Sequence, residues 1–288
     1  MSVSVIVPTY ARADFLEVAL GSIDRQTHPA LEVIVVDDAS PDDEPARVAA
    51  AHGAQLIRHD TNRGVGAARA TGAARAQGDW IAFLDSDDEW LPSHLETLWT
   101  NRHGVVLVAS QGAGTLNGHV YSYPGRQTLE VTSPAQILRP SNLVANSGTM
   151  VRRDAFHRAG GIRPLETCED LDLWVRVLEC GRGRLLPHVT FRYHQHEEQA
   201  TSRAAEFEQG LLELLETYRD RPWWDNDILK GARTAAAWDK FRRVLRTGRL
   251  FGAARTGAAL AEPVNFSQLV RLLRYRRACR RAHYRAQY

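Results

Sequence analysis

The chain has 288 residues, 44% of them hydrophobic and 24% charged, which is typical of a folded globular protein with one large domain or one domain and an appendage. It lacks both a basic leader and any stretch near the roughly 18 consecutive apolar residues of a membrane span, so we expect a cytoplasmic protein. The three cysteines (Cys168, Cys180 and Cys279) are odd in number and not at zinc-ligand spacing, which predicts reduced thiols and argues against a disulfide framework.

The net charge of +2 hides a strong asymmetry. Residues 242–288 contain twelve arginines and one acid, giving +11, whereas the residues before them contain 24 basic and 33 acidic side chains, giving −9. One interpretation is that this basic arm contacts an anionic surface, either nucleic acid or the inner face of the membrane, where lipid-linked acceptors would lie. The other is that its helices pack on the acidic body of the same chain.

Strands and helices alternate along the first hundred residues, which predicts right-handed βαβ units and a parallel sheet. Further along, residues 189–193 have the pattern of a strand, and residues 206–218, 227–245 and 266–287 have that of helices. The early strands are expected at residues 4–8, 32–36, 55–58 and 80–84, and the helices between them at 15–23, 45–51 and 67–76.

Two of these strands end in acids. Residues 37–38 follow the second strand, and four acids fall within residues 85–89 after the fourth. Because carboxylates at the end of a buried strand repel one another, they need a compensating positive charge, and a divalent cation with hard oxygen ligands would supply it. The alternative is a solvated acidic loop that caps a helix starting near Pro92.

Five segments, in this order and spacing, resemble the successive motifs of family-two glycosyltransferases with the GT-A fold. The resemblance implies an α/β catalytic domain over residues 1–204, with a central, mostly parallel sheet flanked by helices, and leaves residues 205–288 as a helical, arginine-rich C-terminal region. The segments are VSVIVPTY at the start, VIVVDDAS at 33–40, NRGVGAARATGAARAQGDWIAFLDSDD at 62–88, NSGTMVRRDAF at 146–156 and CEDLDLWVR at 168–176.

The resemblance also implies how a nucleotide would be held. Pro8, Tyr10 and Asp38 would surround the base and ribose, with the Asp38 carboxylate accepting a hydrogen bond from the ring N–H of a uracil-like or thymine-like base. Asp85 would lie near the ribose or a metal-bound water. Arg69 would approach the phosphates; the alternative is that it lies on a solvated helix face, since residues 63 and 75 are arginines as well.

A cation is implied by the triplet at residues 85–87. In the family the second acid of this triplet, here Asp87, is a direct ligand of Mn²⁺ or Mg²⁺, which stabilises charge on the departing phosphate as a Lewis acid. A late histidine completes the metal site or contacts the phosphates, and His196 fits that position best, with His194 as the alternative.

The catalytic base implied by the last motif is Asp170, a carboxylate whose pKa can rise as the site excludes water. Asp172 should point away from it on the same helix. Gly148, Glu169 and Trp174 are expected at the acceptor or sugar pocket, and the apolar residues around Trp174 should seat the helix on the body.

These implications predict an inverting, metal-dependent transferase that moves a sugar from a nucleoside-diphosphate sugar, with UDP or dTDP favoured, to an acceptor hydroxyl in cell-surface polysaccharide or glycoconjugate synthesis. The alternative is a catalytically silent nucleotide-sugar-binding or scaffolding protein that uses its basic arm for membrane or nucleic-acid contact. A nucleotidyltransferase would need a glycine- and arginine-rich loop after the first strand, which residues 9–13 do not provide. Ala11 and Ala70 stand where the family often has asparagine, and residues 111–140 match no motif.

Overall fold

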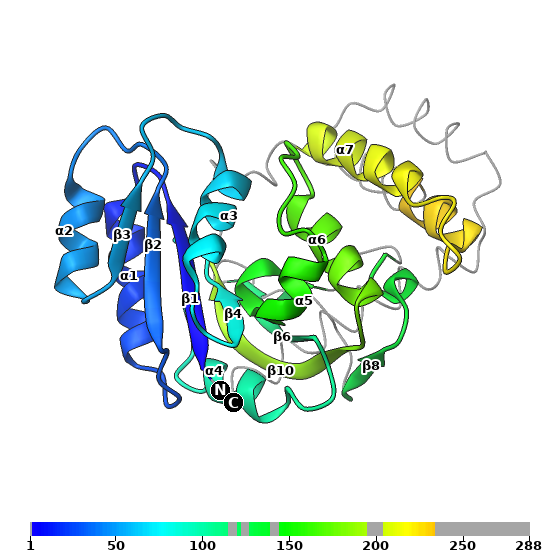
Figure 1. Cartoon of the computed structure of the whole chain (residues 1–288), viewed down its shortest axis with the longest axis horizontal. Coiled ribbons are helices and arrows are strands. Elements are labelled where there is room, and N and C mark those ends of the chain that lie inside the picture. The colour runs from blue at the N-terminus through cyan, green and yellow to red at the C-terminus, as the bar shows by residue number, and fades with distance from the viewer. Residues whose placement is uncertain (1, 115–119, 122–126, 139–143, 195–203, 234–288) are drawn as a thin grey trace, which may run out of the picture.

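A central sheet with helices on both faces forms the body of the molecule (Figure 1). The computed structural model describes residues 2–114, 120–121, 127–138, 144–194 and 204–233. The described strands are β1 (Val3–Thr9), β2 (Glu32–Asp37), β3 (Gln55–Arg58), β4 (Trp80–Phe83), β5 (Asp88–Trp90), β6 (Leu107–Gly114), β7 (Val120–Tyr121), β8 (Leu129–Val131), β9 (Thr149–Arg152) and β10 (Gly183–Tyr193). The α-helices are α1 (Ala13–Asp24), α2 (Glu44–Ala51), α3 (Val65–Arg75), α4 (His94–Thr100), α5 (Arg153–Arg158), α6 (Glu169–Glu179) and α7 (Ala204–Thr217), and the 3₁₀ turns are η1 (Pro134–Gln136) and η2 (Asn146–Gly148).

The sheet has two halves of different character. Its strand order is β3-β2-β1-β4-β9-β6-β10-β5, with β7 paired to β6 and β8 to β10. The strands from β3 to β4 are parallel, as the βαβ pattern predicts. In the other half β10 and β6 are parallel, whereas β9 runs antiparallel to both β4 and β6. Strands β5 and β8 pair antiparallel with β10, and β7 pairs antiparallel with β6. The α/β fold class is therefore confirmed, but the expectation of a mostly parallel sheet is wrong for this half.

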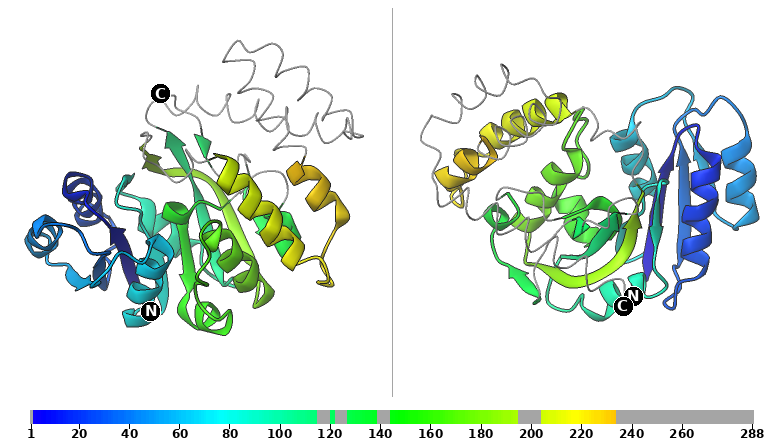
Figure 2. Two further views of the ribbon diagram at one scale, coloured as in Figure 1. Left: turned by 90° about the horizontal axis from the view of Figure 1, so that it is seen from above. Right: turned by 180° about the vertical axis from the view of Figure 1, so that it is seen from behind.

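Strand β1 lies at the centre of the parallel half, and its side chains alternate between two cores. Val5 and Val7 belong to the core beneath α1, whereas Ile6 belongs to the core beneath α3 (Figure 2). Helix α3 lies so close to the sheet at Gly72 that a Cβ on this residue would be only 2.5 Å from the Ile6 Cγ2 atom. A glycine is required there, and the close contact fixes the position of the helix that carries Arg69.

The predicted strands and helices of the first hundred residues are all present, with small shifts at their ends. Strands β5 to β9 and helix α5 were not predicted; β5 lies within the acidic segment, and β7 and β8 lie within residues 111–140. The predicted helix at 206–218 corresponds to α7. Residues 226–233 are helical, while the rest of that predicted helix and the one at 266–287 lie outside the described residues.

Helix α7 and the residues after it pack on α6. Leu215 and Tyr218 are buried in the same core as Trp174. The domain boundary at residue 204 stays a prediction. Within the described part of the chain, no helix is long and apolar enough to cross a bilayer.

Candidate functional site

Acidic side chains from two strands meet at one edge of the sheet. Strands β2 and β4 flank β1 and run parallel to it, so residues 37–38 and 85–88 follow strands that end on the same side. The loop after β1 lies between the two acidic segments, because the Ala11 N–H donates to Ser40 Oγ at 2.8 Å and Arg12 pairs with Asp87 at 3.1 Å. The prediction that the acids share an edge is confirmed.

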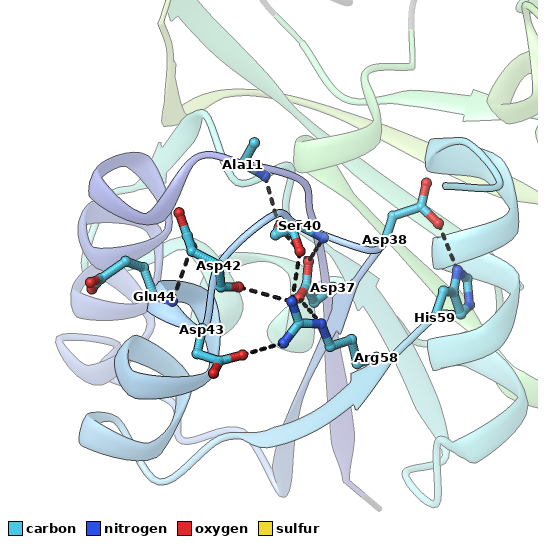
Figure 3. A network of polar contacts seen from close by, with 9 residues as sticks. All are labelled: Ala11, Asp37, Asp38, Ser40, Asp42, Asp43, Glu44, Arg58 and His59. Atoms are coloured by element: carbon cyan, nitrogen blue, oxygen red, sulfur yellow. Dashed lines mark hydrogen bonds and ion pairs between the residues drawn. The ribbon is translucent and has the colours of Figure 1, made fainter. Parts of the chain in front are cut away.

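Asp37 holds the turn after β2 in shape (Figure 3). Its buried Oδ1 accepts bonds from the Ser40 N–H at 3.0 Å and from Ser40 Oγ at 2.5 Å. Arg58 reaches Asp37 Oδ2 at 3.2 Å and also bonds the Ser40 carbonyl at 2.6 Å. Asp37 therefore stabilises the turn after β2.

Asp38 faces the other way, toward the start of α3. Its Oδ1 accepts bonds from His59 Nδ1 at 2.6 Å and the Arg63 N–H at 2.9 Å, and its Oδ2 accepts one from the Gly64 N–H at 2.7 Å with a longer contact to Arg63 at 3.1 Å. A carboxylate has about four acceptor positions. The described contacts therefore fill these positions, with the Arg63 N–H shared between the two oxygens.

Arg69 is the central cation of the site. It is 7% exposed, and its two terminal nitrogens donate to Asp85 Oδ1 and Glu169 Oε1, both at 2.5 Å. Burial alone would lower the pKa of Arg69, but the Asp85 and Glu169 carboxylates outweigh it and raise that pKa above its ordinary value. The helix-face alternative for Arg69 is wrong, since its guanidinium is buried between two acids.

Turn η2 closes the site beneath Asp85. Asn146 Nδ2 donates to Asp85 Oδ1 at 3.0 Å, and the Asp85 N–H donates to Ser147 Oγ at 3.1 Å. The Ser147 hydroxyl donates to Asp88 Oδ2 at 2.5 Å. Burial, with the Asp85 and Asp87 carboxylates, raises the pKa of Asp88 well above its ordinary value. Because Asp88 is 3% exposed and lies in β5, the solvated-loop alternative is wrong here.

Asp170 lies in the first turn of α6, next to the Arg69–Glu169 pair. The helix is entered through Cys168, whose φ of 60° is left-handed. Burial and the adjacent Glu169 carboxylate raise the pKa of Asp170 to about 7, although Arg69 and a 2.7 Å bond from the Leu171 N–H act in the opposite direction. Asp170 retains some exposure, so it is a carboxyl group that titrates near neutrality and can be reached from solvent.

Asp172 points away from the site, as predicted. It is fully buried, accepts from Arg176 Nη2 at 2.5 Å and from the Tyr218 hydroxyl at 2.6 Å, and so ties α6 to the end of α7. The buried thiol of Cys168 has its pKa raised to about 12, mainly by burial and then by Asp170, which keeps it protonated.

Two of the expected pocket residues have internal roles. A Cβ at Gly148 would lie 2.8 Å from both the Phe191 ring and the Ser110 carbonyl, so the glycine is required by packing between strands rather than by a ligand. Trp174 is fully buried and forms an edge-to-face pair with Phe83, with ring centroids 6.0 Å apart. It supports the site only from within the core, so the expectation that it contacts a sugar or acceptor is wrong in this structure.

The remaining sequence-predicted residues divide between the sheet edge and the undescribed segments. Pro8 is buried in β1, beyond the last residue that pairs with β4, and Tyr10 follows it with 47% of its surface exposed. His196 lies outside the described residues. The backbone N–H of the alternative residue, His194, donates to Asp88 Oδ1 at 3.4 Å. The ring Nε2 of His194 lies 3.8 Å from Glu89 Oε2.

The carboxylates suit a cation that arrives with its own ligands. The described residues contain no group of three or more His, Cys, Asp or Glu side chains able to hold a metal ion. Mg²⁺ and Mn²⁺ are, however, commonly bound by one or two carboxylates together with substrate phosphates. Asp87, with Asp85 beside it, fits that kind of site. A metal cage made by the described side chains alone is not present.

Four residues at the site were not singled out from the sequence: Arg12, His59, Asn146 and Ser147. Asn146 and Ser147 directly precede Gly148, and that adjacency was the available signal. His59 follows β3 as Asp38 follows β2, so strand-end position could have indicated it. Nothing local links Arg12 to Asp87, which is 75 residues away.

Comparisons with known proteins match the chain to one family. The family model for glycosyl transferase family 2 matches residues 4–157. The succinoglycan biosynthesis protein ExoO of Rhizobium meliloti is 32% identical, over 91% of this chain and 82% of its own length. An uncharacterised glycosyltransferase of Haemophilus influenzae is 28% identical over 61% of this chain, which spans only 62% of that relative's length.

Solved structures resemble the fold at lower identity. TarS of S. aureus (residues 1–349), in complex with UDP-GlcNAc, aligns with a TM-score of 0.66 at 20% identity, over 99% of this chain and 90% of that one. A mannosyltransferase of Pyrobaculum calidifontis, in complex with GDP-Man and Mn²⁺, aligns with a TM-score of 0.64 at 22% identity, over 100% of this chain and 88% of that one. The family-model match over more than half of its residues and the 32% identity to ExoO show that the chain belongs to glycosyl transferase family 2.

Proposed function

We propose that the protein is an inverting glycosyltransferase that moves a sugar from a UDP- or dTDP-linked donor to an acceptor hydroxyl, in the synthesis of a cell-surface polysaccharide or glycoconjugate. The observation that carries this proposal is the Arg69 bridge. It joins Asp85, at the strand end expected to bind the nucleotide, to Glu169, next to the expected base. The name of the Rhizobium relative supports the polysaccharide context.

Nucleotide recognition is assigned to the edge around β1. Pro8, Tyr10 and Asp38 would surround the base, with the ring N–H of uracil or thymine taking the place of the longer, shared Arg63 contact on Asp38 Oδ2. The loop N–H groups of residues 63 and 64 hold that carboxylate in place before the nucleotide arrives. A pre-positioned acceptor loses less freedom on binding and therefore contributes more to affinity.

Transfer is assigned to Asp170. In its ionised form it takes the proton of the acceptor hydroxyl while the hydroxyl oxygen attacks the anomeric carbon from the side opposite the diphosphate. The bond from that carbon to the diphosphate oxygen breaks with its electron pair, so the configuration inverts and no covalent sugar–enzyme intermediate forms. Mn²⁺ or Mg²⁺, held by Asp87 with Asp85 beside it, would supply Lewis-acid stabilisation of the departing diphosphate. The assignment of His196 to this cation rests on sequence alone.

The proposal can be tested before the acceptor is known, because water can replace it. Purified protein is incubated with Mn²⁺ and a panel of UDP-glucose, UDP-galactose, UDP-GlcNAc, dTDP-glucose and GDP-mannose, and nucleotide release is followed with the anomer of the first-formed sugar read by NMR. We expect slow release from one UDP or dTDP sugar, with an inverted anomer, and at least about a hundredfold less from Asp170→Asn. A retained anomer, release only from GDP-mannose, or equal release by the variant would contradict the proposal.

A further inference from the structure

Each acid of the segment that follows β4 has a different partner. Asp85 pairs with Arg69, Asp87 with Arg12 at 3.1 Å, Asp88 with Ser147, and Glu89 with Arg25 at 3.3 Å and Arg192 at 2.8 Å. The positive charge that the sequence analysis required is therefore supplied largely by the arginines of the chain. A cation that binds Asp87 must share that carboxylate with Arg12 or displace it.

Arg12 has a fixed backbone and a side chain that reaches solvent. It is the residue immediately before α1, its carbonyl accepts from the Leu16 N–H at 3.0 Å, and the preceding Ala11 is held by Ser40 in a left-handed conformation with φ 51°. Its side chain is 26% exposed, whereas that of Arg69 is 8% exposed. Of these two guanidinium groups, Arg12 can leave its carboxylate at the lower desolvation cost.

A pocket of about 350 Å³ lies beside Arg12. It is lined by Ala11, Arg12 and Phe15 and by three acidic residues: Asp14 of α1, Asp42 of the loop after β2, and Glu44, the first residue of α2. Figure 3 shows Asp42 on the loop that continues from Ser40, which bonds Ala11, and Glu44 where the helix begins. Glu44 already pairs with Arg47, so Asp14 and Asp42 are the carboxylates considered below. A guanidinium that leaves Asp87 has carboxylates within the same pocket that can receive it.

We propose that Arg12 is an exchangeable counter-ion of Asp87: it neutralises this carboxylate while the cation is absent, and swings into the acidic pocket when a divalent cation takes its place. This proposal rests on the proposed function, because it assumes that Asp87 is the carboxylate that holds the cation. The exchange keeps the acids of residues 85–88 neutralised in both states. It also makes Arg12 a competitor that sets the metal affinity of the enzyme.

The direct test measures Mn²⁺ affinity from the EPR signal of the free ion, with and without saturating UDP. Arg12→Gln removes the competitor, and we expect it to bind Mn²⁺ about tenfold more tightly than the wild type. The matched control is Arg25→Gln, which loses the same charge opposite the neighbouring Glu89 and should stay within about twofold of the wild type. Asp87→Asn should lose the bound metal.

The acidic pocket is tested by a double-mutant cycle. Asp14→Asn combined with Asp42→Asn removes two acceptors for the displaced guanidinium. It should weaken Mn²⁺ binding more in the wild-type background than in Arg12→Gln. An equal loss in both backgrounds would mean that these acids act only through their general field, and would remove the pocket from the proposal.

The outcomes separate this inference from the proposed function. If the wild type binds Mn²⁺ through Asp87 but Arg12→Gln changes nothing, or Arg25→Gln tightens binding equally, the exchange is wrong and the proposed function stands. If no variant binds Mn²⁺ even with UDP, the exchange and the metal assignment both fall, and the sugar-release assay decides separately whether transfer remains. Should Arg12→Gln not fold, as judged by circular dichroism, Arg12→Met keeps the apolar stem and carries the same expectation.

Discussion

Asp170 occupies an environment that a catalytic base needs and a structural carboxylate does not. Burial and Glu169 raise the pKa of Asp170 to about 7. Arg69, held between Glu169 and Asp85, limits that rise. A mutation of Arg69 would therefore disturb the base as well as the nucleotide side of the site.

The pH dependence of the wild-type enzyme follows from this pKa. Below about pH 7 Asp170 is protonated and cannot accept a proton, so we expect kcat/KM for sugar release to rise about tenfold per pH unit and to level off above pH 7. The measurement is a pH series from 5.5 to 8.5 with the preferred donor. A flat profile across this range would exclude Asp170 as the titrating base.

Asp170→Asn supplies an independent control through stability. A folded-state pKa above the unfolded value means that ionised Asp170 destabilises the fold as pH rises from about 4 to 7. The variant should therefore be more stable than the wild type at pH 8, by up to a few kcal/mol, and this advantage should shrink to about a third at pH 5. Urea unfolding at the two pH values measures the difference, and equal stability at both would show that Asp170 is not held in a costly environment.

The positions of the acids were predictable from the sequence because they follow strand ends. Asp38 and Asp85 share an edge because their strands flank β1, and this follows from the βαβ pattern. The partners of those acids were not predictable. Arg12 and Asp87, or Arg69 and Glu169, are 75 and 100 residues apart, and only the folded sheet brings them together.

At the scale of elements, the mixed half of the sheet positions the site floor. Strands β6 and β10 and turn η2 meet where Phe191 packs over Gly148, and η2 carries Asn146 and Ser147 to the acids. Strand β5 was not predicted because three residues with two acids form no local pattern. It exists through its antiparallel pairing with residues 191–193 of β10.

Gly148→Ala tests whether this floor is a packing site or a ligand site. The added methyl would lie 2.8 Å from the Phe191 ring and from the Ser110 carbonyl, so we expect a loss of about 1–3 kcal/mol of stability by urea unfolding. Phe191→Leu should relieve part of this loss in the double variant, because it removes the ring. Unchanged stability with a large loss of nucleotide affinity would restore the sequence-based expectation of a glycine that faces the donor.

At the scale of the whole molecule, stability should depend on a buried neutral histidine. His94 is fully buried, stacks on Trp90 with ring centroids 4.2 Å apart, and bonds Thr190 Oγ1 at 2.7 Å through Nδ1. Burial lowers the pKa of His94 to about 3. Between about pH 6.5 and pH 3 the unfolded chain therefore binds a proton at this residue that the folded chain does not.

This histidine predicts a loss of stability in acid. Above about pH 6.5 the neutral His94 does not reduce the free energy of unfolding. As the pH falls to 5, protonation of this residue in the unfolded chain lowers that free energy by about 2 kcal/mol. His94→Gln should be less stable at pH 7.5, since it loses the ring stacking, but its unfolding free energy should fall less between pH 7.5 and 5 than that of the wild type. A parallel decline in both proteins would show that His94 does not set the acid sensitivity.

The charge asymmetry between the body and residues 242–288 is the global feature that the sequence shows most clearly. The arm that carries it lies outside the described residues, so both its membrane contact and its packing on the body stay predictions. Liposome co-sedimentation with and without residues 242–288 would distinguish them, because membrane contact predicts that binding is lost with the arm. The parallel half of the sheet was predictable because the βαβ pattern is local and regular.

The central claim is that the edge around β1 binds a pyrimidine nucleoside diphosphate together with a cation on Asp87. Calorimetric titration with UDP, dTDP and GDP, each with Mn²⁺ and with chelator, tests it on the wild type and on Asp87→Asn. We predict that UDP or dTDP binds at least about tenfold more tightly with Mn²⁺ than with chelator, that GDP binds weakly, and that the variant loses the dependence on metal. Equal affinity for all three nucleotides, or binding that is indifferent to Mn²⁺ in the wild type, would contradict the account.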